Sequence, residues 1–295
     1  MERDFVGYGK DYPRVKWPNN ARLAVSFCIN FEEGAEKSLQ DGDRAPETVG
    51  EVRKGINSAI RDLAIESIFE YGSRVGFWRI IELLEKHNVE ATYFASALAL
   101  ENNQKATREI VEKKHEICGH GYRWKEPFLM TRKEETNSIH KAAISIERVS
   151  GVRPLGWYSR YGPTIRTREI LKKEGFLYDS DSYADDSPYT IKVKGEPWVI
   201  VPYTMDANDF QFYYNRFSTG DQFLQFLNDT FQWLYEEGKS KTRMMSIGLH
   251  NRVIGKPGRI GALDRFLNHI KTFPDIWIAR RIDIAKWWYQ NYHEK

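Results

Sequence analysis

Two glutamates and two histidines stand at the ends of short apolar runs, and their types could support acid–base chemistry. They are Glu32, Glu33, His120 and His250. A carboxylate whose pKa is raised in a dry pocket and an imidazole are common general bases and acids near neutral pH. Adjacent residues at a strand end point to opposite faces, so we expect Glu32 and Glu33 to have different roles. The alternatives are an exposed acidic turn and two structural histidines.

Four further polar residues follow other apolar runs. Tyr158 and Arg160 come at the end of PLGWYS, and Asp206 and Asn208 follow WVIVPYT. In a barrel of parallel strands the active site lies at the carboxyl ends of the strands, so these side chains would meet the glutamates and histidines there. Their shared position predicts one site at this edge of the sheet.

The elements that would position these residues alternate between short apolar runs and longer helical patterns. We expect strands over 23–31, 90–95, 116–120, 154–159, 176–180, 198–204, 244–250 and 276–279. We expect helices over 73–87, 131–150, 164–175 and 220–238. Most of the runs are apolar on both faces, which is typical of parallel strands covered by helices. The alternation predicts an α/β fold, most simply a barrel.

The alternation continues along the whole chain, which predicts a single domain over residues 1–295. One stretch interrupts it, because residues 35–72 are too many for a simple strand-to-helix connection. Long loops in compact domains are usually functional. We therefore expect a lid or a contact surface in this segment.

The composition excludes several classes of protein. The chain has 295 residues and a net charge of +3, with 44 Lys+Arg against 41 Asp+Glu, which is too small a charge for a nucleic-acid-binding surface. No apolar run approaches the ~18 residues that span a bilayer, and the first residues lack the apolar core of a secretory signal. We therefore expect a cytoplasmic protein with no nucleic-acid or membrane partner. The two cysteines, Cys28 and Cys118, lie in apolar runs, which indicates buried thiols in a reducing compartment.

Three other features carry weaker signals. Aromatic residues make up 14% of the chain, and they could form the core or line a ligand pocket. The basic stretch from Arg252 to Arg259 could bind an anion, although a solvated loop is the simpler interpretation. A group of four aspartates lacks the ligand spacing of a calcium-binding loop: Asp179, Asp181, Asp185 and Asp186.

Several sequence motifs resemble those of the polysaccharide deacetylase superfamily. The motifs are NFEEG (30–34), KHEICGHGYRW (114–124), PLGWYSRYGP (154–163) and IGLH (247–250). The sequence is most similar to the PuuE-type allantoinases, through EYGSR (70–74), FLYDSDSY (176–183), VPYTMDANDF (201–210) and the stretch 252–259. This resemblance implies a distorted (β/α) barrel with about seven strand–helix units. It also implies hydrolysis of the hydantoin ring of allantoin to allantoate in purine catabolism, and a homo-oligomer that is commonly a tetramer.

The metal-binding positions of that superfamily are altered in this chain. The resemblance places the ligands of the metal-dependent members at Glu33, His120 and Trp124. Indole offers only an N–H donor, so Trp124 cannot be a ligand and a zinc site with three protein ligands cannot form in the usual way. The resemblance therefore implies no metal and no other cofactor, and it puts Glu32 at the position of the catalytic base.

The resemblance also suggests roles in the proposed hydrolysis. Glu32 would deprotonate a water that attacks the ring carbonyl. His120 and His250 would position the substrate, stabilise the oxyanion or protonate the leaving nitrogen, and Trp124 would pack on the flat ring. The other expected contacts to the cyclic ureide are Tyr158, Arg160, Asp206 and Asn208.

Two alternative functions remain open from the sequence. One is a metal-dependent deacetylase of N-acetylglucosamine-containing oligo- or polysaccharides of the chitin or peptidoglycan type, and the other is a non-catalytic binding protein on the same scaffold. A hydantoin amide expels a urea-type nitrogen, which leaves more easily than an amine and favours the allantoinase for a site without a metal. The stretch 158–162 and Asn251 depart from the closer relatives, which leaves the exact substrate open.

Overall fold

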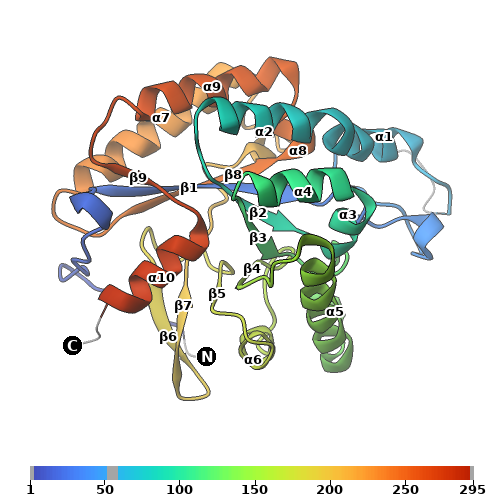
Figure 1. Cartoon of the computed structure of the whole chain (residues 1–295), viewed down its shortest axis with the longest axis horizontal. Helices are drawn as coiled ribbons and strands as arrows, with labels where there is room; N and C mark the ends of the chain where they lie inside the picture. The colour runs from blue at the N-terminus through green and yellow to red at the C-terminus, as the bar shows by residue number, and fades with distance from the viewer. Residues whose placement is uncertain (1–2, 52–58, 293–295) are drawn as a thin grey trace.

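The computed structural model describes residues 3–51 and 59–292. Nine strands in these residues form one curved sheet in the order β6-β7-β5-β4-β3-β2-β1-β8, and β9 pairs with β1. Helices surround this sheet (Figure 1), which confirms the predicted α/β, barrel-like fold. The strands are β1 (Leu23–Phe31), β2 (Thr92–Ala95), β3 (Glu116–Gly119), β4 (Gly156–Trp157), β5 (Tyr178–Asp179), β6 (Tyr189–Val193), β7 (Glu196–Ile200), β8 (Met244–His250) and β9 (Ile276–Ile278).

The central strand β1 is buried along its whole length. Its odd-numbered residues, such as Phe27 and Ile29, join the larger apolar core together with residues of the outer helices. Its even-numbered residues Ala24 and Cys28 join a second core on the inner side of the curved sheet. Side chains of a strand alternate between its two faces, so this alternation decides which residue after β1 reaches the inner side.

The helices cover both sides of the sheet. Figure 1 shows α2, α7 and α9 along one side of β1 and α10 on the other side. The predicted capping box at Thr131 and Glu134 is present at the start of α5. No helix in the described ranges is long and apolar enough to cross a bilayer. The helices are α1 (Leu63–Tyr71), α2 (Phe77–Lys86), α3 (Ala97–Asn102), α4 (Gln104–Glu112), α5 (Arg132–Ser150), α6 (Thr167–Lys173), α7 (Gly220–Glu237), α8 (Asn251–Ile254), α9 (Pro257–Ile270) and α10 (Arg281–Asn291).

The sequence did not predict the hairpin of β6 and β7. These two strands pair antiparallel, while the other strand pairs of the sheet are parallel. The turn between them places Lys194 and Gly195 at positive φ, the conformation of a two-residue hairpin turn. The expected strand 198–204 therefore begins earlier, as the second arm of this hairpin, and ends at Ile200.

Two segments that were expected to be loops are partly helical. The segment 35–72 contains α1, whose first turn is capped by the Asp62 carboxylate, and residues 52–58 of this segment lie outside the described residues. A π-helical turn, Gly72–Gly76, joins α1 to α2. The basic stretch 252–259 belongs to α8 and α9, and Pro257 stands in the first turn of α9, where proline costs no hydrogen bond.

Candidate active site

A cavity of about 220 Å³ lies at the carboxyl ends of β1, β3 and β8. Seven of the predicted site residues line it: Glu32, His120, Trp124, Tyr158, Arg160, Asn208 and His250. The remaining lining residues are Asn30, Tyr161, Tyr183, Tyr203, Met205 and Phe210. The structure therefore brings together side chains from the first, third, fourth and later strand ends, as expected for a barrel of parallel strands.

Glu33 does not reach this cavity. Glu32 continues the inward face of β1, and Glu33 follows the outward face with Phe31. The Glu33 carboxylate accepts a hydrogen bond from Asn251 Nδ2 at 3.0 Å and lies 3.3 Å from Arg252 Nη1. It also packs closely against Gly72, where a Cβ would lie 2.5 Å from Glu33 Oε1. The expectation that Glu33 takes part in catalysis is corrected, although the two glutamates do have different surroundings.

Asp206 also lies outside the cavity, which corrects its expected role as a substrate contact. Its side chain is exposed, and its backbone forms a turn in which the carbonyl accepts from the Asn208 amide at 2.8 Å. Asn208 lines the cavity and donates to the Tyr203 hydroxyl at 3.2 Å. The turn therefore delivers Asn208, and not Asp206, to the inner side.

Asp209 is the buried acid of this turn, and sequence reasoning missed it. Its Oδ1 lies 2.7 Å from His250 Nδ1, and its Oδ2 accepts from the backbone amides of His250 at 2.8 Å and Ile254 at 3.0 Å. A carboxylate beside Nδ1 holds the proton on that nitrogen and leaves Nε2 to exchange protons. His250 Nε2 lies 4.0 Å from Glu32 Oε1. The only signal in the sequence was its place within VPYTMDANDF.

His120 has a partner at each ring nitrogen. Its Nδ1 donates to the Tyr158 carbonyl at 2.6 Å, and its ring stacks on the Tyr158 ring with centroids 5.1 Å apart. Trp124 Nε1 donates to His120 Nε2 at 3.0 Å. Indole nitrogen can only donate, so the lone pair of Nε2 is directed to Trp124. His120 is thus oriented by both neighbours.

Glu32 lies beside the Arg252 guanidinium and between the two imidazoles. Its Oε2 lies 2.7 Å from Arg252 Nη2, and its Oε1 lies 3.3 Å from His120 Nε2. Burial raises the pKa of Glu32, but the Arg252 guanidinium and the two histidines lower it by more, so the pKa lies well below the ordinary value. The raised pKa expected of one of the two glutamates is therefore not found at Glu32. By contrast, burial raises the pKa of Glu33, with the nearby Glu32 adding to the effect and Arg252 opposing it.

Arg252 is fully buried, which corrects the expectation that the basic stretch is a solvated loop. A second buried arginine, Arg160, is held by a residue of the segment 35–72. Glu47 Oε2 accepts from Arg160 Nη1 at 2.8 Å, and both side chains are 2% exposed. The Arg160 guanidinium also stacks on the Trp124 ring at 3.6 Å from its centroid. The segment 35–72 therefore supplies part of the support for the cavity wall.

The residues at the expected metal-binding positions do not fit a metal ion. The Glu33 carboxylate is turned away and held by Asn251 and Arg252, and the lone pair of His120 Nε2 faces the Trp124 N–H. Within residues 3–51 and 59–292, no group of three or more His, Cys, Asp or Glu is arranged to hold an ion. These side chains therefore do not form a metal-binding site.

Two of the four aspartates that could suggest a calcium site, Asp179 and Asp181, are buried and bind other protein groups. Asp179 pairs with Arg168 at 2.8 Å, and Asp181 accepts from the Ser159 amide at 2.6 Å and from its hydroxyl at 2.8 Å. Burial, with the neighbouring Asp179, raises the pKa of Asp181 to about 7. These carboxylates therefore stabilise the β4 and β5 loops.

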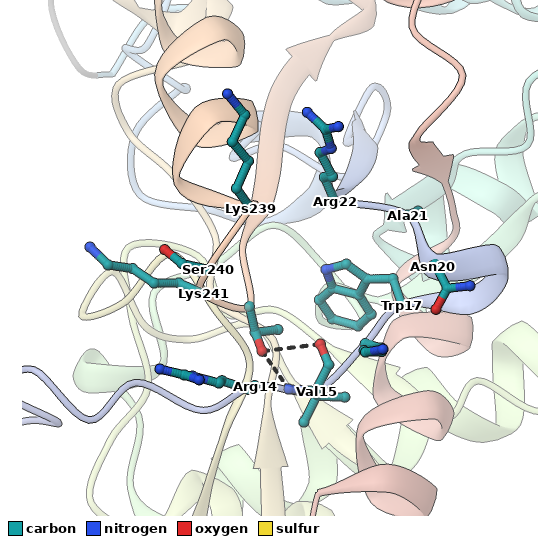
Figure 2. Close-up of a pocket in the computed structure, with 12 residues that line it drawn as sticks. Arg14, Val15, Trp17, Asn20, Ala21, Arg22, Lys239, Ser240 and Lys241 are labelled. Carbon is teal, nitrogen blue, oxygen red and sulfur yellow. Dashed lines mark hydrogen bonds between the residues drawn. The ribbon is translucent and has the colours of Figure 1, made fainter.

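A larger cavity, of about 720 Å³, lies at the opposite, amino-terminal ends of β1 and β8. Figure 2 shows Trp17 in this cavity, with Arg22, Lys239 and Lys241 around it. Each of these three cations is paired with a neighbouring carboxylate. No histidine, aspartate or glutamate lines this cavity in the part of the chain that the structure describes. It therefore lacks the combination of carboxylate and imidazole groups that lines the smaller cavity.

Comparison with known proteins agrees with the sequence motifs. The family model described as polysaccharide deacetylase matches residues 61–178. A Schizosaccharomyces pombe protein named as a polysaccharide deacetylase is 36% identical over 310 residues, which cover 97% of this chain and 96% of the relative. A crystal structure named as a polysaccharide deacetylase from Pseudomonas aeruginosa PAO1 is 41% identical, with a TM-score of 0.95 and full coverage of both chains. The crystal structure of PuuE allantoinase is 40% identical, with a TM-score of 0.95 over 100% of this chain and 99% of that chain.

Proposed function

The chain belongs to the polysaccharide deacetylase family, and we propose that it is an allantoinase that opens the hydantoin ring of allantoin without a metal ion. The observation that carries this proposal is the pair of contacts around His120. The Trp124 N–H cannot bind a metal ion, because indole nitrogen can only donate. It donates to His120 Nε2, the nitrogen that would have to bind the metal. The 40% identity to PuuE allantoinase over the whole chain supports the same substrate.

The size and walls of the cavity support a small, flat substrate. Its volume of about 220 Å³ is below the roughly 300–1,000 Å³ of pockets for drug-sized ligands. Its walls carry the aromatic rings of Trp124, Tyr158, Tyr203 and Phe210, which suit the faces of a planar ring. Asn208 and Arg160 supply polar groups at the edges, where a ureide presents its carbonyls and N–H groups.

The geometry favours His250 as the general base of this reaction. A carboxylate whose pKa lies far below neutral is a weak base, which argues against the role that the sequence suggested for Glu32. Asp209 holds the proton on His250 Nδ1, so Nε2 can accept a proton from a water as the water oxygen attacks the ring carbonyl. Glu32, with Oε1 at 4.0 Å from Nε2, stabilises the imidazolium that forms. The same Nε2–H then protonates the ring nitrogen as the C–N bond breaks.

The nature of the leaving group explains how a site without a metal ion could hydrolyse a hydantoin. The ring amide of a hydantoin expels a urea-type nitrogen, which carries negative charge more easily than the amine released from an acetamide. Arg160 lines the cavity as a buried cation, and we propose that its positive charge stabilises the oxyanion of the tetrahedral intermediate. An N-acetyl sugar would need more activation of its carbonyl than these residues supply.

Turnover of allantoin by the purified protein tests the proposal. We expect allantoate to form at the same rate with and without excess chelator, and we expect Glu32→Gln to lower kcat by roughly 10²-fold or more. Glu85→Gln is the matched control, because Glu85 pairs with Lys113 at the surface. Release of acetate from N-acetylglucosamine oligomers that depends on added zinc, with no turnover of allantoin, would instead establish the deacetylase named for the relatives. Binding without turnover of either would establish a non-catalytic protein.

We also propose that the protein acts as a homo-oligomer, such as a tetramer, in the cytoplasm. Several apolar side chains are strongly exposed, including Leu129 at 73%, Ile165 at 95% and Trp233 at 71%. Contiguous exposed apolar surface marks contacts between subunits, and we propose that these side chains contribute to such contacts. Light scattering on the purified protein tests this, and a monomeric mass would contradict it.

A further inference from the structure

Arg252 joins the two glutamates that follow β1 to the helix that follows β8. It lies in α8 (Asn251–Ile254), fully buried, and it does not line the cavity. Its Nη2 lies 2.7 Å from Glu32 Oε2, and its Nη1 lies 3.3 Å from Glu33 Oε1. A guanidinium stays charged in a protein, so this position requires an anion beside it.

The two oxygens of the Glu32 carboxylate have separate neighbours. Oε2 faces Arg252, whereas Oε1 faces the imidazoles, at 3.3 Å from His120 Nε2 and 4.0 Å from His250 Nε2. The electrostatic attraction between Arg252 and Oε2 favours this orientation of the carboxylate. Without it, a buried carboxylate with three rotatable side-chain bonds would have other orientations.

The guanidinium itself is held on its flat face. Its central carbon lies 4.3 Å from the Phe69 ring centroid and 5.3 Å from the Trp124 ring centroid. A planar group stacked on rings and facing two carboxylates has little freedom to move, and a lysine could not reproduce this geometry. Arg252 is therefore built into a fixed position behind Glu32.

We propose that Arg252 is a positioning residue for the hydrolysis, because it holds Glu32 Oε2 and thereby directs Oε1 toward the reacting side of His250. This inference rests on the proposed function of the cavity and deepens it. Arg252 does not itself line the cavity, and the proposal assigns its effect on turnover to Glu32. The proposal therefore predicts that the effect of changing Arg252 disappears once Glu32 can no longer act.

A double-mutant cycle on turnover tests this dependence. We expect Arg252→Lys to lower kcat roughly 10²-fold, the loss typical of a misplaced catalytic group, with KM changed less than about 3-fold. In a Glu32→Gln background we expect the same change to cost less than about 3-fold. Losses that multiply in the double variant would overturn the proposal. Arg259→Lys is the matched control, because Arg259 pairs with Glu51 outside the cavity.

A crystal structure of Arg252→Lys gives a readout that does not depend on the substrate. We expect Glu32 Oε1 to leave its place beside His120 and His250, while the fold is retained. An unchanged Glu32 side chain would overturn the proposal even if allantoin is hydrolysed. If allantoin is not hydrolysed by the unmodified protein, the proposed function fails, and the structure still decides whether Arg252 orients Glu32. If Arg252→Lys does not fold, the double variant Glu32→Gln/Arg252→Met, which removes both charges, takes its place. Its turnover is compared with that of Glu32→Gln alone. A further loss of more than about 3-fold would overturn the proposal.

Discussion

Asp209→Asn is expected to abolish most of the activity by changing the tautomer of His250. Asp209 Oδ2 accepts from the backbone amides of His250 and Ile254, at 2.8 and 3.0 Å. In the variant, the amide oxygen of asparagine would take this place, because it is the only acceptor of the new side chain. The NH₂ group would then face His250 Nδ1, where Asp209 Oδ1 now lies at 2.7 Å.

This arrangement reverses the proton on the imidazole. Nδ1 would have to accept from the NH₂ group, so the ring proton would move to Nε2, which could no longer take a proton from water. The corresponding change in a serine protease triad lowers kcat about 10⁴-fold. We expect a fall of roughly 10³–10⁴-fold, equivalent to about 4.1–5.4 kcal/mol in the activation free energy.

The assay is kcat for allantoin across pH, together with thermal unfolding of both proteins. We expect the unfolding temperature to change little, because the variant keeps both hydrogen bonds to the backbone. Asp275→Asn, which breaks a surface pair with Arg22, serves as the control. A folded Asp209→Asn protein with kcat within about 10-fold of the unmodified protein would refute the role of His250 as the base.

Three further predictions concern the supports of the site and the stability of the fold. Glu47→Gln should destabilise the protein by about 2 kcal/mol in chemical unfolding and raise KM, because it removes the nearer of the two carboxylates beside the buried Arg160 and leaves Glu126 at 3.6 Å; an unchanged KM would remove this pair from substrate binding. Trp124→Phe should lower kcat about 10-fold, because it removes the N–H that orients His120, and full activity would show that this donor is dispensable. Burial, with nearby positive charge, lowers the pKa of His115 to about 4, below the ~6.5 of the unfolded chain. Its contribution to stability is therefore present above pH ~6.5 and is lost as the pH falls toward 4, by up to roughly 3 kcal/mol. His115→Asn should weaken this dependence in unfolding curves, and an unchanged curve would contradict the assignment.

The sequence predicted those parts of the site that depend on the period of a strand. Glu32, His120 and His250 each follow an apolar run, and each run became a buried parallel strand that ends at the cavity. The period of two also predicted that Glu32 and Glu33 would differ in their surroundings. These signals depend only on neighbouring residues, so a single sequence is enough to predict them.

The partners of these residues could not be predicted in the same way. Arg252 is 220 residues from Glu32 along the chain, and Glu47 is 113 residues from Arg160. Their basic and acidic surroundings are typical of exposed loops, and only the fold buries them. Asp206 and Asp209 follow the same apolar run, and the turn that exposes one and buries the other has no distinctive composition, so the local composition gives no signal for Asp209.

Trp124, at an expected metal-ligand position, contacts several other residues of the site, so replacing it alone cannot create a metal site. Trp124 donates to His120, its ring carries the Arg160 guanidinium at 3.6 Å, and its carbonyl accepts from Arg160 Nη1 at 2.6 Å. A histidine at this position would restore a possible ligand, but Glu33 would still face Arg252 and Asn251. A metal site would therefore need the ion pair of Arg252 to be undone as well, and that change would release Glu32. The indole and the buried arginine thus belong to one arrangement, which occupies the positions that the family resemblance assigns to metal ligands.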